Sequence, residues 1–150
     1  MRIKANNEIK LILPALSENE SLARSVIAAF VSQVNPRVDE LVDIRTAVSE
    51  AVTNCIVHAY PDKAGEIVLT ARLYNNGRVV IRVQDHGCGI PDIEQAREPL
   101  FTTGGEERSG LGFSVMESLC DSVRVKSKSG GGTVVTLEKY IKQEEEAAPS

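Results

Sequence analysis

Two polar side chains stand four residues apart within an apolar stretch of the sequence. Glu50 and Asn54 lie between Ala47 and Ala59, where few other residues are polar, and His58 continues the same spacing. On a helix such residues form one stripe, with neighbours about 6 Å apart. A carboxamide oxygen suits Mg²⁺, which needs few protein ligands when phosphates supply the others, and a carboxylate beside it could act as a base. The alternative is a Glu–Asn pair that faces solvent, although a buried carboxylate without a task is costly.

A second candidate segment is the glycine-rich stretch that starts at Asp85. It follows a segment whose apolar alternation ends at Val83, and Gly87 and Gly89 come directly after it. An ionised carboxylate at the end of a strand could accept a hydrogen bond from an exocyclic amine such as that of adenine. The glycines would let the backbone approach a flat ligand. An ordinary Asp–Gly turn is the alternative interpretation.

A third candidate segment, residues 109–112 (Ser-Gly-Leu-Gly), precedes a helical pattern. Backbone N–H groups at a helix start favour an anion, and Arg108 just before them offers a positive charge for a terminal phosphate. A flexible helix entry is the alternative. The P-loop, the protein-kinase signatures and a dinucleotide fingerprint after the first strand are absent from the sequence, which excludes those three kinds of nucleotide site.

Alternating hydrophobicity predicts the strands that would carry these segments. The pattern indicates a strand over residues 8–14, a hairpin of residues 67–73 and 79–83, and a closing hairpin of residues 122–127 and 133–137. The first hairpin has Asn-Asn-Gly at 75–77, a strong tight-turn signal.

Helical spacing predicts three helices. The first begins at Ser17, with a capping box formed with Glu20, and ends near Asn35. The second has Pro36 in its first turn and runs to about Tyr60. The third covers residues 110–121, and residues 92–97 could form a short helix. These elements favour an α+β fold, a two-layer sandwich with helices on one sheet face.

Composition indicates one domain over residues 1–141, a mobile polar lid at 98–109 and a disordered acidic tail at 142–150. The net charge of −4 argues against nucleic acid as the main partner. The three cysteines lack zinc spacing, which is typical of reduced cytosolic thiols. The longest apolar run, residues 26–31, is too short to span a bilayer, and no signal peptide is evident. We therefore expect a cytoplasmic protein without a membrane partner.

The three segments in this order resemble the ATP-binding boxes of the GHKL ATPase/kinase superfamily, which includes gyrase B, MutL and sensor histidine kinases. Residues 50–60 (EAVTNCIVHAY) resemble its N box, residues 85–90 (DHGCGI) its G1 box, residues 109–112 its G2 box, and Gly132–Thr133 its closing Gly–Thr pair. Residues 17–24, 48–54, 90–103 and 107–113 are further similar to the sporulation anti-sigma F factors, a family of serine kinases in sporulating bacteria.

The resemblance implies a Bergerat fold with a mixed, mostly antiparallel sheet and a nucleotide pocket for ATP or ADP between helices and lid. It implies that Asn54 binds Mg²⁺, that Glu50 polarises the attacking hydroxyl, and that Asp85 binds the adenine amine. Gly87 and Gly89 would line the base, Thr133 would reach it through water, and His58 would lie in the pocket or simply pack. The residues that would enclose the phosphates are Thr102, Thr103, Arg108, Ser109, Gly110, Leu111 and Gly112.

The resemblance also implies an anti-sigma factor that inhibits a sporulation sigma factor and phosphorylates a serine of its anti-anti-sigma factor. It would act as a homodimer, and Arg24 on the first helix would contact the partner; an exposed helix charge is the alternative for Arg24. Competing interpretations are a general-stress anti-sigma kinase, a nucleotide-dependent binding module without kinase activity, and a detached histidine-kinase catalytic domain. The presence of Glu50 counts against the binding module.

Overall fold

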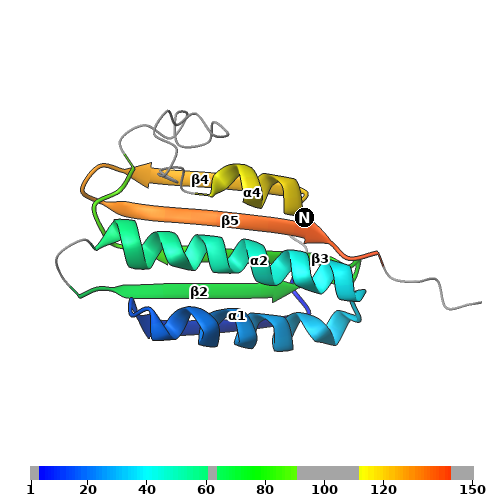
Figure 1. Ribbon diagram of the computed structural model, residues 1–150. Helices are drawn as coiled ribbons and strands as arrows, with labels where there is room; N and C mark the ends of the chain where they lie inside the picture. The colour runs from blue at the N-terminus through cyan, green and yellow to red at the C-terminus, as the bar shows by residue number, and fades with distance from the viewer. Residues whose placement is uncertain (1–3, 61–63, 91–111, 143–150) are drawn as a thin grey trace, which may run out of the picture.

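The computed structural model describes residues 4–60, 64–90 and 112–142, which form a sheet covered by helices (Figure 1). The strands are β1 (Asn7–Pro14), β2 (Glu66–Leu73), β3 (Arg78–Asp85), β4 (Ser122–Lys128) and β5 (Gly132–Tyr140). The described α-helices are α1 (Glu18–Val31), α2 (Val38–Asn54) and α4 (Phe113–Leu119). A 3₁₀ turn, Ser32–Val34, follows α1, and a π-helical turn, Cys55–Ala59, follows α2.

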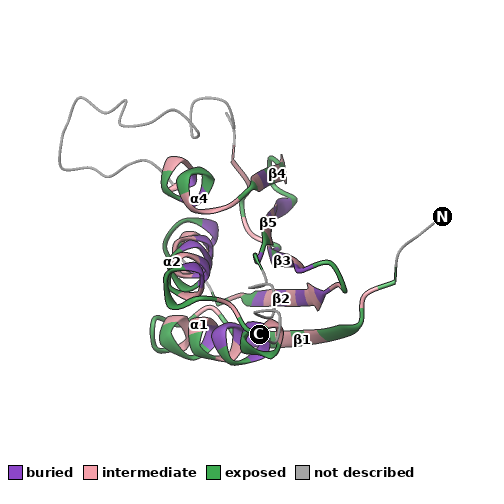
Figure 2. Ribbon diagram, turned by 90° about the vertical axis from the view of Figure 1, so that its right-hand side faces the viewer, coloured by how far each residue is buried: buried purple, intermediate pink, exposed green. Residues whose placement is uncertain are grey.

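The strands form one sheet in the order β1-β2-β3-β5-β4. The hairpins β2–β3 and β4–β5 are those that the sequence predicts, β1 joins β2 across two helices, and β5 joins β3. The expectation of a mixed sheet is wrong for the described strands, since every neighbouring pair is antiparallel. Between β1 and β2 each of the two helices reverses the chain, so β2 returns against β1. The predicted α+β sandwich is confirmed, with the described helices on one face of the sheet (Figure 2).

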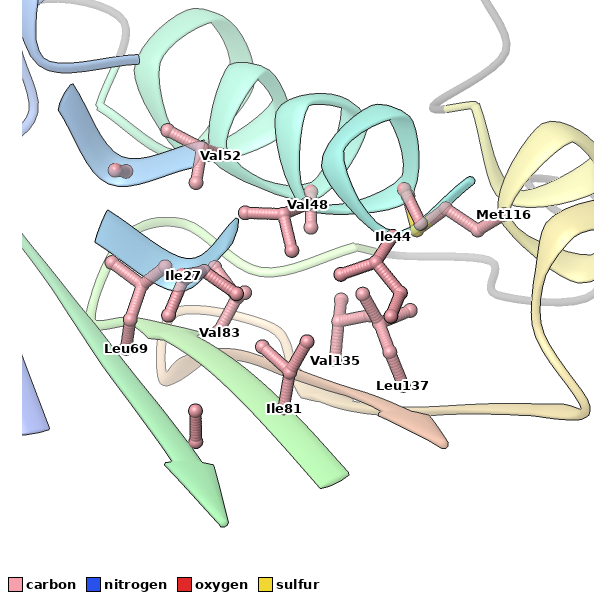
Figure 3. Close-up of a cluster of buried hydrophobic side chains, with 14 of the residues drawn as sticks. Ile27, Ile44, Val48, Val52, Leu69, Ile81, Val83, Met116, Val135 and Leu137 are labelled. Carbon is pink, nitrogen blue, oxygen red and sulfur yellow. The ribbon is translucent and has the colours of Figure 1, made fainter. Parts of the chain in front are cut away.

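The core lies between this helical layer and the sheet, because every second residue of the central strands is buried. Figure 3 shows helix side chains packed above those of β2, β3 and β5. Ten of the buried residues in this cluster are Ile27, Ile44, Val48, Val52, Leu69, Ile81, Val83, Met116, Val135 and Leu137. Each such side chain contributes about 1.5–3 kcal/mol relative to exposure. This packing holds α2 across the sheet, with its C-terminal end over the end of β3.

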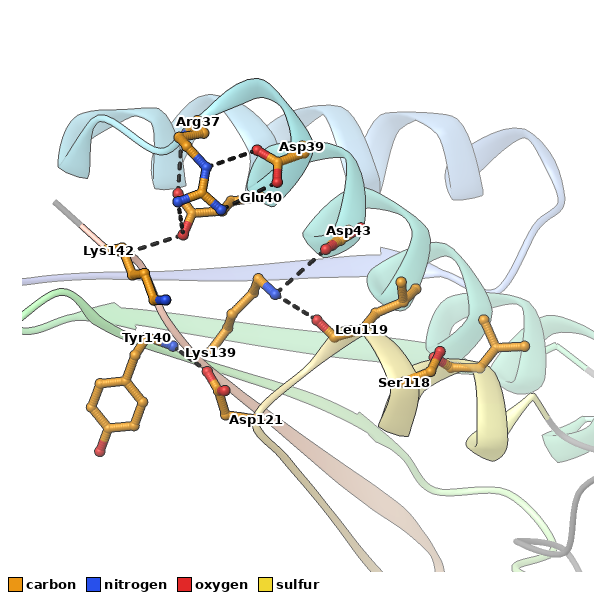
Figure 4. Close-up of polar contacts among 11 residues, drawn as sticks. Arg37, Asp39, Glu40, Asp43, Ser118, Leu119, Asp121, Lys139, Tyr140 and Lys142 are labelled. Atoms are coloured by element: carbon orange, nitrogen blue, oxygen red, sulfur yellow. Dashed lines mark hydrogen bonds and ion pairs between the residues drawn. The ribbon is translucent and has the colours of Figure 1, made fainter. Parts of the chain in front are cut away.

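Polar contacts hold the opposite end of α2 (Figure 4). The buried carboxylate of Glu40 accepts hydrogen bonds from the backbone N–H of Arg37 at 2.9 Å and of Lys142 at 3.0 Å. The Nζ of Lys139 on β5 donates a hydrogen bond to the carbonyl oxygen of Leu119 at 2.7 Å. These bonds tie α2 and α4 to the last strand, so both helices keep a defined position over the sheet.

The start of the first helix differs from the sequence prediction. Ser17 has helical dihedrals (φ −58°, ψ −32°) and makes no side-chain capping bond, because an N-cap residue must adopt an extended conformation to cap. Glu20 instead accepts a hydrogen bond from Ser49 Oγ on α2 at 2.6 Å and forms an ion pair with Arg24. The predicted capping box is therefore wrong, and its carboxylate joins α1 to α2.

The second helix begins later than predicted. Arg37 is its N-cap and Val38 its first residue, so Pro36 precedes the first turn instead of occupying it. The left-handed Asn35 (φ 53°) turns the chain between the 3₁₀ turn and α2. The predicted end near Tyr60 is confirmed, although its last turn is π-helical.

Several predictions fall outside the described residues: the short helix at 92–97, the lid at 98–109, the first two residues of the third helix, and all but Lys142 of the tail. Within the described ranges, no helix is long and apolar enough to cross a membrane.

Candidate functional site

The C-terminal end of α2 carries the first two predicted site residues. Glu50 and Asn54 lie one helical turn apart, and the π-helical turn begins at the next residue, Cys55. π-helical turns are rare and occur frequently at functional sites. His58 lies within this turn, whereas the sequence predicts it on the α-helical stripe of Glu50 and Asn54. His58 and Asn54 nevertheless line the same cavity.

This open cavity, with about 360 Å³ of empty space that includes the solvent at its mouth, lies between the end of α2, the end of β3, the start of β5 and the start of α4. Five of the predicted site residues line it, namely Asn54, His58, Asp85, Gly89 and Thr133. The sequence analysis missed its apolar lining, which consists of Ala51, Cys55, Ala59, Val83, Ile90, Phe113 and Val135. Ligand sites are commonly apolar with a few placed polar groups. The alternation that marks Val83 and Val135 as core residues could also have marked them as pocket floor.

Asp85 is held at the floor of the cavity by backbone donors. It is the last residue of β3, pairs with Thr133 of β5 and is only 6% exposed. Its Oδ1 accepts the N–H of Gly87 at 2.9 Å and that of Thr133 at 3.2 Å. Its Oδ2 lies 3.6 Å from the Cys55 thiol. Burial and the neighbouring carboxylate raise the pKa of Cys55, so the thiol keeps its proton and donates it to this carboxylate in a hydrogen bond.

The two glycines of the predicted loop provide room for close backbone packing. A side chain at Gly87 would collide with the carbonyl oxygen of Ala59, and Gly89 has φ +79° and packs against the carbonyl of Lys128. The N–H of Cys88 donates to that Ala59 carbonyl at 3.0 Å. The loop is therefore clamped between the π-helical turn and the β4–β5 hairpin, and Gly89 is the glycine that reaches the cavity.

Thr133 of β5 and His58 of the π-helical turn also line the cavity. The hydroxyls of Thr133 and Ser127 lie 2.8 Å apart, which fixes Thr133 at the cavity wall. Burial lowers the pKa of His58 below its usual value, so its imidazole is neutral at pH 7.

Glu50 meets the start of α4. Gly112, the left-handed N-cap of α4 (φ +73°), lies so close to the Glu50 carboxylate that a side chain there would have to push this carboxylate aside. The structure thus brings together Glu50 of the predicted N box and Gly112 of the predicted G2 box. Thr102, Thr103, Arg108, Ser109, Gly110 and Leu111 lie outside the described residues.

A divalent cation at this site would take most of its ligands from water and from a bound phosphate rather than from protein side chains. The described residues contain no group of three or more His, Cys, Asp or Glu side chains placed to hold a metal. The carboxamide oxygen of Asn54 fits a hard cation that keeps waters and takes phosphate oxygens. The donor set therefore fits Mg²⁺ bound together with a nucleotide.

Arg24 lies apart from the cavity. It is on α1, and α2 separates α1 from α4 (Figure 1). Its side chain is 37% exposed and forms an ion pair with Glu20 at 3.3 Å, and its buried Nε has no hydrogen-bond partner among the described residues. The structure does not bring Arg24 to the residues of the cavity.

Known proteins of one family are similar to this chain over most of its length. Residues 13–139 match the model of the histidine kinase-like ATPase domain. The chain is 50% identical over 137 residues to the anti-sigma F factor of Caldanaerobacter subterraneus subsp. tengcongensis, covering 91% of this chain and 95% of that protein. It is 52% identical over 136 residues to the anti-sigma F factor of Geobacillus kaustophilus, covering 90% and 93%.

Two solved structures share the fold. The crystal structure of the RsbU and RsbW domains of Rv1364c from Mycobacterium tuberculosis aligns with a TM-score of 0.68 at 23% identity, over 91% of this chain and 33% of that one. The catalytic domain of the histidine kinase ThkA aligns with a TM-score of 0.56 at 19% identity, over 90% of this chain and 96% of that domain. Residues of the N box, the G1 box and the closing Gly–Thr pair line the cavity of this fold, which agrees with the resemblance.

Proposed function

The chain belongs to the histidine kinase-like ATPase domain family and, within it, to the anti-sigma F factors, and from that premise we propose a protein serine kinase that also binds a sigma factor. The kinase would transfer the γ-phosphoryl group of MgATP to a serine of an anti-anti-sigma factor. The observation that carries this proposal is the convergence of Asn54, Asp85 and Thr133 on one cavity, together with the approach of Glu50 to Gly112 at the start of α4.

Asp85 would recognise the adenine base. Its Oδ1 already accepts two backbone N–H groups, whereas within the described ranges its Oδ2 accepts a hydrogen bond from the Cys55 thiol, which is a weak donor. Oδ2 is therefore the oxygen with accepting capacity for the exocyclic amine. Gly87 and Gly89 would let the base approach the backbone, Thr133 would contact it through water, and the neutral His58 would pack beside it.

Asn54 would hold the magnesium ion together with phosphate oxygens, and Gly112 with the residues that precede it would surround the phosphates. Those residues are Thr102, Thr103, Arg108, Ser109, Gly110 and Leu111. Bound magnesium would neutralise charge on the transferring phosphoryl group. Phosphoryl transfer depends mainly on positioning and charge neutralisation, which suits a carboxamide and a helix N-terminus.

Glu50 would act on the acceptor. Its carboxylate would hydrogen-bond the serine hydroxyl and take its proton as the serine oxygen bonds to phosphorus and ADP leaves. The closeness of Glu50 to Gly112 supports this role, because Gly112 is the last residue of the segment that we propose for the phosphates.

The sigma factor would bind elsewhere. We assign Arg24 to that contact within a homodimer, because α1 lies away from the cavity and the Arg24 side chain is partly exposed. Binding of the nucleotide and of the sigma factor would then use different surfaces of one chain.

The test is phosphorylation of purified anti-anti-sigma factor with labelled ATP. We expect Glu50→Gln to bind ATP within about threefold of the wild type and to lose phosphoryl transfer by about 10²-fold or more, since proton transfer by a positioned base contributes that much. Asp85→Asn, the matched control at the base end, should lose ATP binding instead.

Two results would contradict the proposal. A Glu50→Gln variant that phosphorylates at the wild-type rate would remove Glu50 from the reaction. A labelled product that hydrolyses in acid would indicate phosphohistidine and favour the detached histidine-kinase alternative over a serine kinase.

A further inference from the structure

We propose that Tyr60 is a positioning residue for base selectivity: its phenol fixes the turn that aims the Asp85 carboxylate into the cavity. This inference rests on the proposed adenine site. It concerns a residue that contacts neither Asp85 nor Thr133 by any hydrogen bond described above.

The phenol of Tyr60 joins three segments that are distant in the sequence. Its hydroxyl accepts the backbone N–H of His86 at 2.7 Å and donates to the carbonyl oxygen of Glu66 at 2.8 Å. Tyr60 follows the π-helical turn, Glu66 begins β2, and His86 is the first residue after β3. Burial raises the pKa of Tyr60, so the hydroxyl keeps the proton that it donates.

The two hydrogen bonds of the Tyr60 hydroxyl take the place of the next backbone pair of the β2–β3 ladder. The β2–β3 ladder ends at the pair Ile67–Asp85, so the following pair in register would be Glu66 and His86. The phenolic oxygen lies between the carbonyl of one and the N–H of the other, and their ladder bond is thereby replaced by two bonds to Tyr60. Tyr60 therefore sets the point at which the chain leaves β3, which is immediately after Asp85.

The same turn is held on its other sides by backbone groups. Ala59 accepts the N–H of Cys88 at 3.0 Å, and Cys88 accepts the N–H of Gly130 at 2.7 Å. Gly87, between His86 and Cys88, donates to Asp85 Oδ1. The position of the Gly87 N–H, and with it the orientation of the carboxylate, thus depends on the anchors at His86 and Cys88.

The local sequence is adapted to the tyrosine ring. Gly65 lies against the ring so closely that any side chain at position 65 would collide with it. Removing the hydroxyl would leave the N–H of His86 and the carbonyl of Glu66 without their partner. These groups would then pair directly or take water, and either change moves His86 and the turn that follows.

The orientation of the Asp85 carboxylate would determine which nucleotide base the cavity prefers. Asp85 Oδ2 can accept a hydrogen bond from the exocyclic amine of adenine. Inosine triphosphate has a carbonyl oxygen in place of this amine, and that oxygen and the carboxylate would repel each other. A site built on such a hydrogen bond rejects the analogue that lacks the donor. A displaced carboxylate loses this discrimination while the phosphates bind as before.

The experiment measures the dissociation constants of ATP and inosine triphosphate by calorimetry for the wild type, Tyr60→Phe and the control Tyr140→Phe, whose exposed ring lies at the far end of β5. We expect the wild type and the control to prefer ATP at least about tenfold. In Tyr60→Phe the ATP affinity should fall about tenfold while the inosine triphosphate affinity changes little, so the ratio approaches one.

A second variant and a spectroscopic measurement distinguish the proposed role of Tyr60 from misfolding of the Tyr60→Phe variant. Gly65→Ala should displace the ring and reduce the ratio in the same way, and the amide proton of His86 should shift upfield in Tyr60→Phe without any nucleotide. Equal weakening of both nucleotides, or an unchanged ratio, would overturn the role of Tyr60. A wild type without preference for ATP would instead contradict the proposed adenine contact of Asp85.

Discussion

Cys55 and Asp85 show how a single residue is tuned by its surroundings. The thiol is buried beside the carboxylate, and burial, followed by the charge of Asp85, raises its pKa. A higher pKa means a smaller thiolate fraction at any given pH, and the thiolate is the reactive form. Cys55 therefore serves as a protonated hydrogen-bond donor to the site.

The three thiols should differ in reactivity accordingly. Burial raises the pKa of Cys120 to about 11, whereas Cys88 is exposed. At pH 8 we expect iodoacetamide to alkylate Cys88 at least about tenfold faster than Cys55 or Cys120, as measured by peptide mass spectrometry over time. Cys88→Ser should leave the folded protein almost unlabelled. Labelling of Cys55 at the rate of Cys88 would contradict this account of the pocket.

At the scale of elements, α2 is held at both ends by different means. Its C-terminal end passes into the π-helical turn and the site, while its N-terminal end is held by the Glu40 carboxylate, which accepts the N–H groups of Arg37 and Lys142. A buried carboxylate with two backbone donors is well satisfied, and its loss leaves the N–H groups of Arg37 and Lys142 without this acceptor.

The effect on stability should be large for one carboxylate and small for its neighbour. We expect Glu40→Ala to lower the free energy of unfolding by about 2–4 kcal/mol, and Glu40→Gln to cost less because its amide oxygen still accepts one N–H. Asp39→Ala, which removes an exposed partner of the same Arg37, should leave the urea midpoint near that of the wild type. Equal midpoints for Glu40→Ala and Asp39→Ala would rule out the anchoring role.

At the scale of the whole molecule, the cavity proposed for the nucleotide and the exposed side of α1 lie on different parts of the helical layer. α2 lies between α1 and α4 in both views (Figures 1 and 2). A substitution on the exposed side of α1 should therefore leave the cavity residues in place, which allows the proposed sigma-factor contact and nucleotide binding to be separated by mutation.

Arg24→Glu tests this separation. We expect the affinity for the sigma factor to fall about tenfold or more, as for a charged interface anchor, while the dissociation constant of ATP stays within about twofold. Arg45→Glu, an exposed charge reversal on α2, is the control and should leave both unchanged. Calorimetry with each ligand checks the result, and an unaltered sigma-factor affinity in Arg24→Glu would withdraw Arg24 from the interface.

Local patterns in the sequence were sufficient for the strands, the two hairpins and the end of the second helix near Tyr60, because alternation and helical spacing record which side of each element is buried. They failed at Ser17 and Pro36, where the helix start depends on contacts with other elements. Ser17 takes helical dihedrals, and Glu20 bonds to Ser49 on α2 instead of capping.

The amino-acid sequence by itself determined the types of chemical groups and the elements that carry them: a carboxylate and a carboxamide one turn apart on α2, and an aspartate at the end of β3. Only the tertiary structure decided that Asp85 pairs with Thr133, that Glu50 meets Gly112, and that a π-helical turn and Tyr60 clamp the intervening loop. The physical reason is that local propensity acts over a few residues, whereas these contacts join segments 26 to 62 residues apart in the chain and depend on strand register and on core packing.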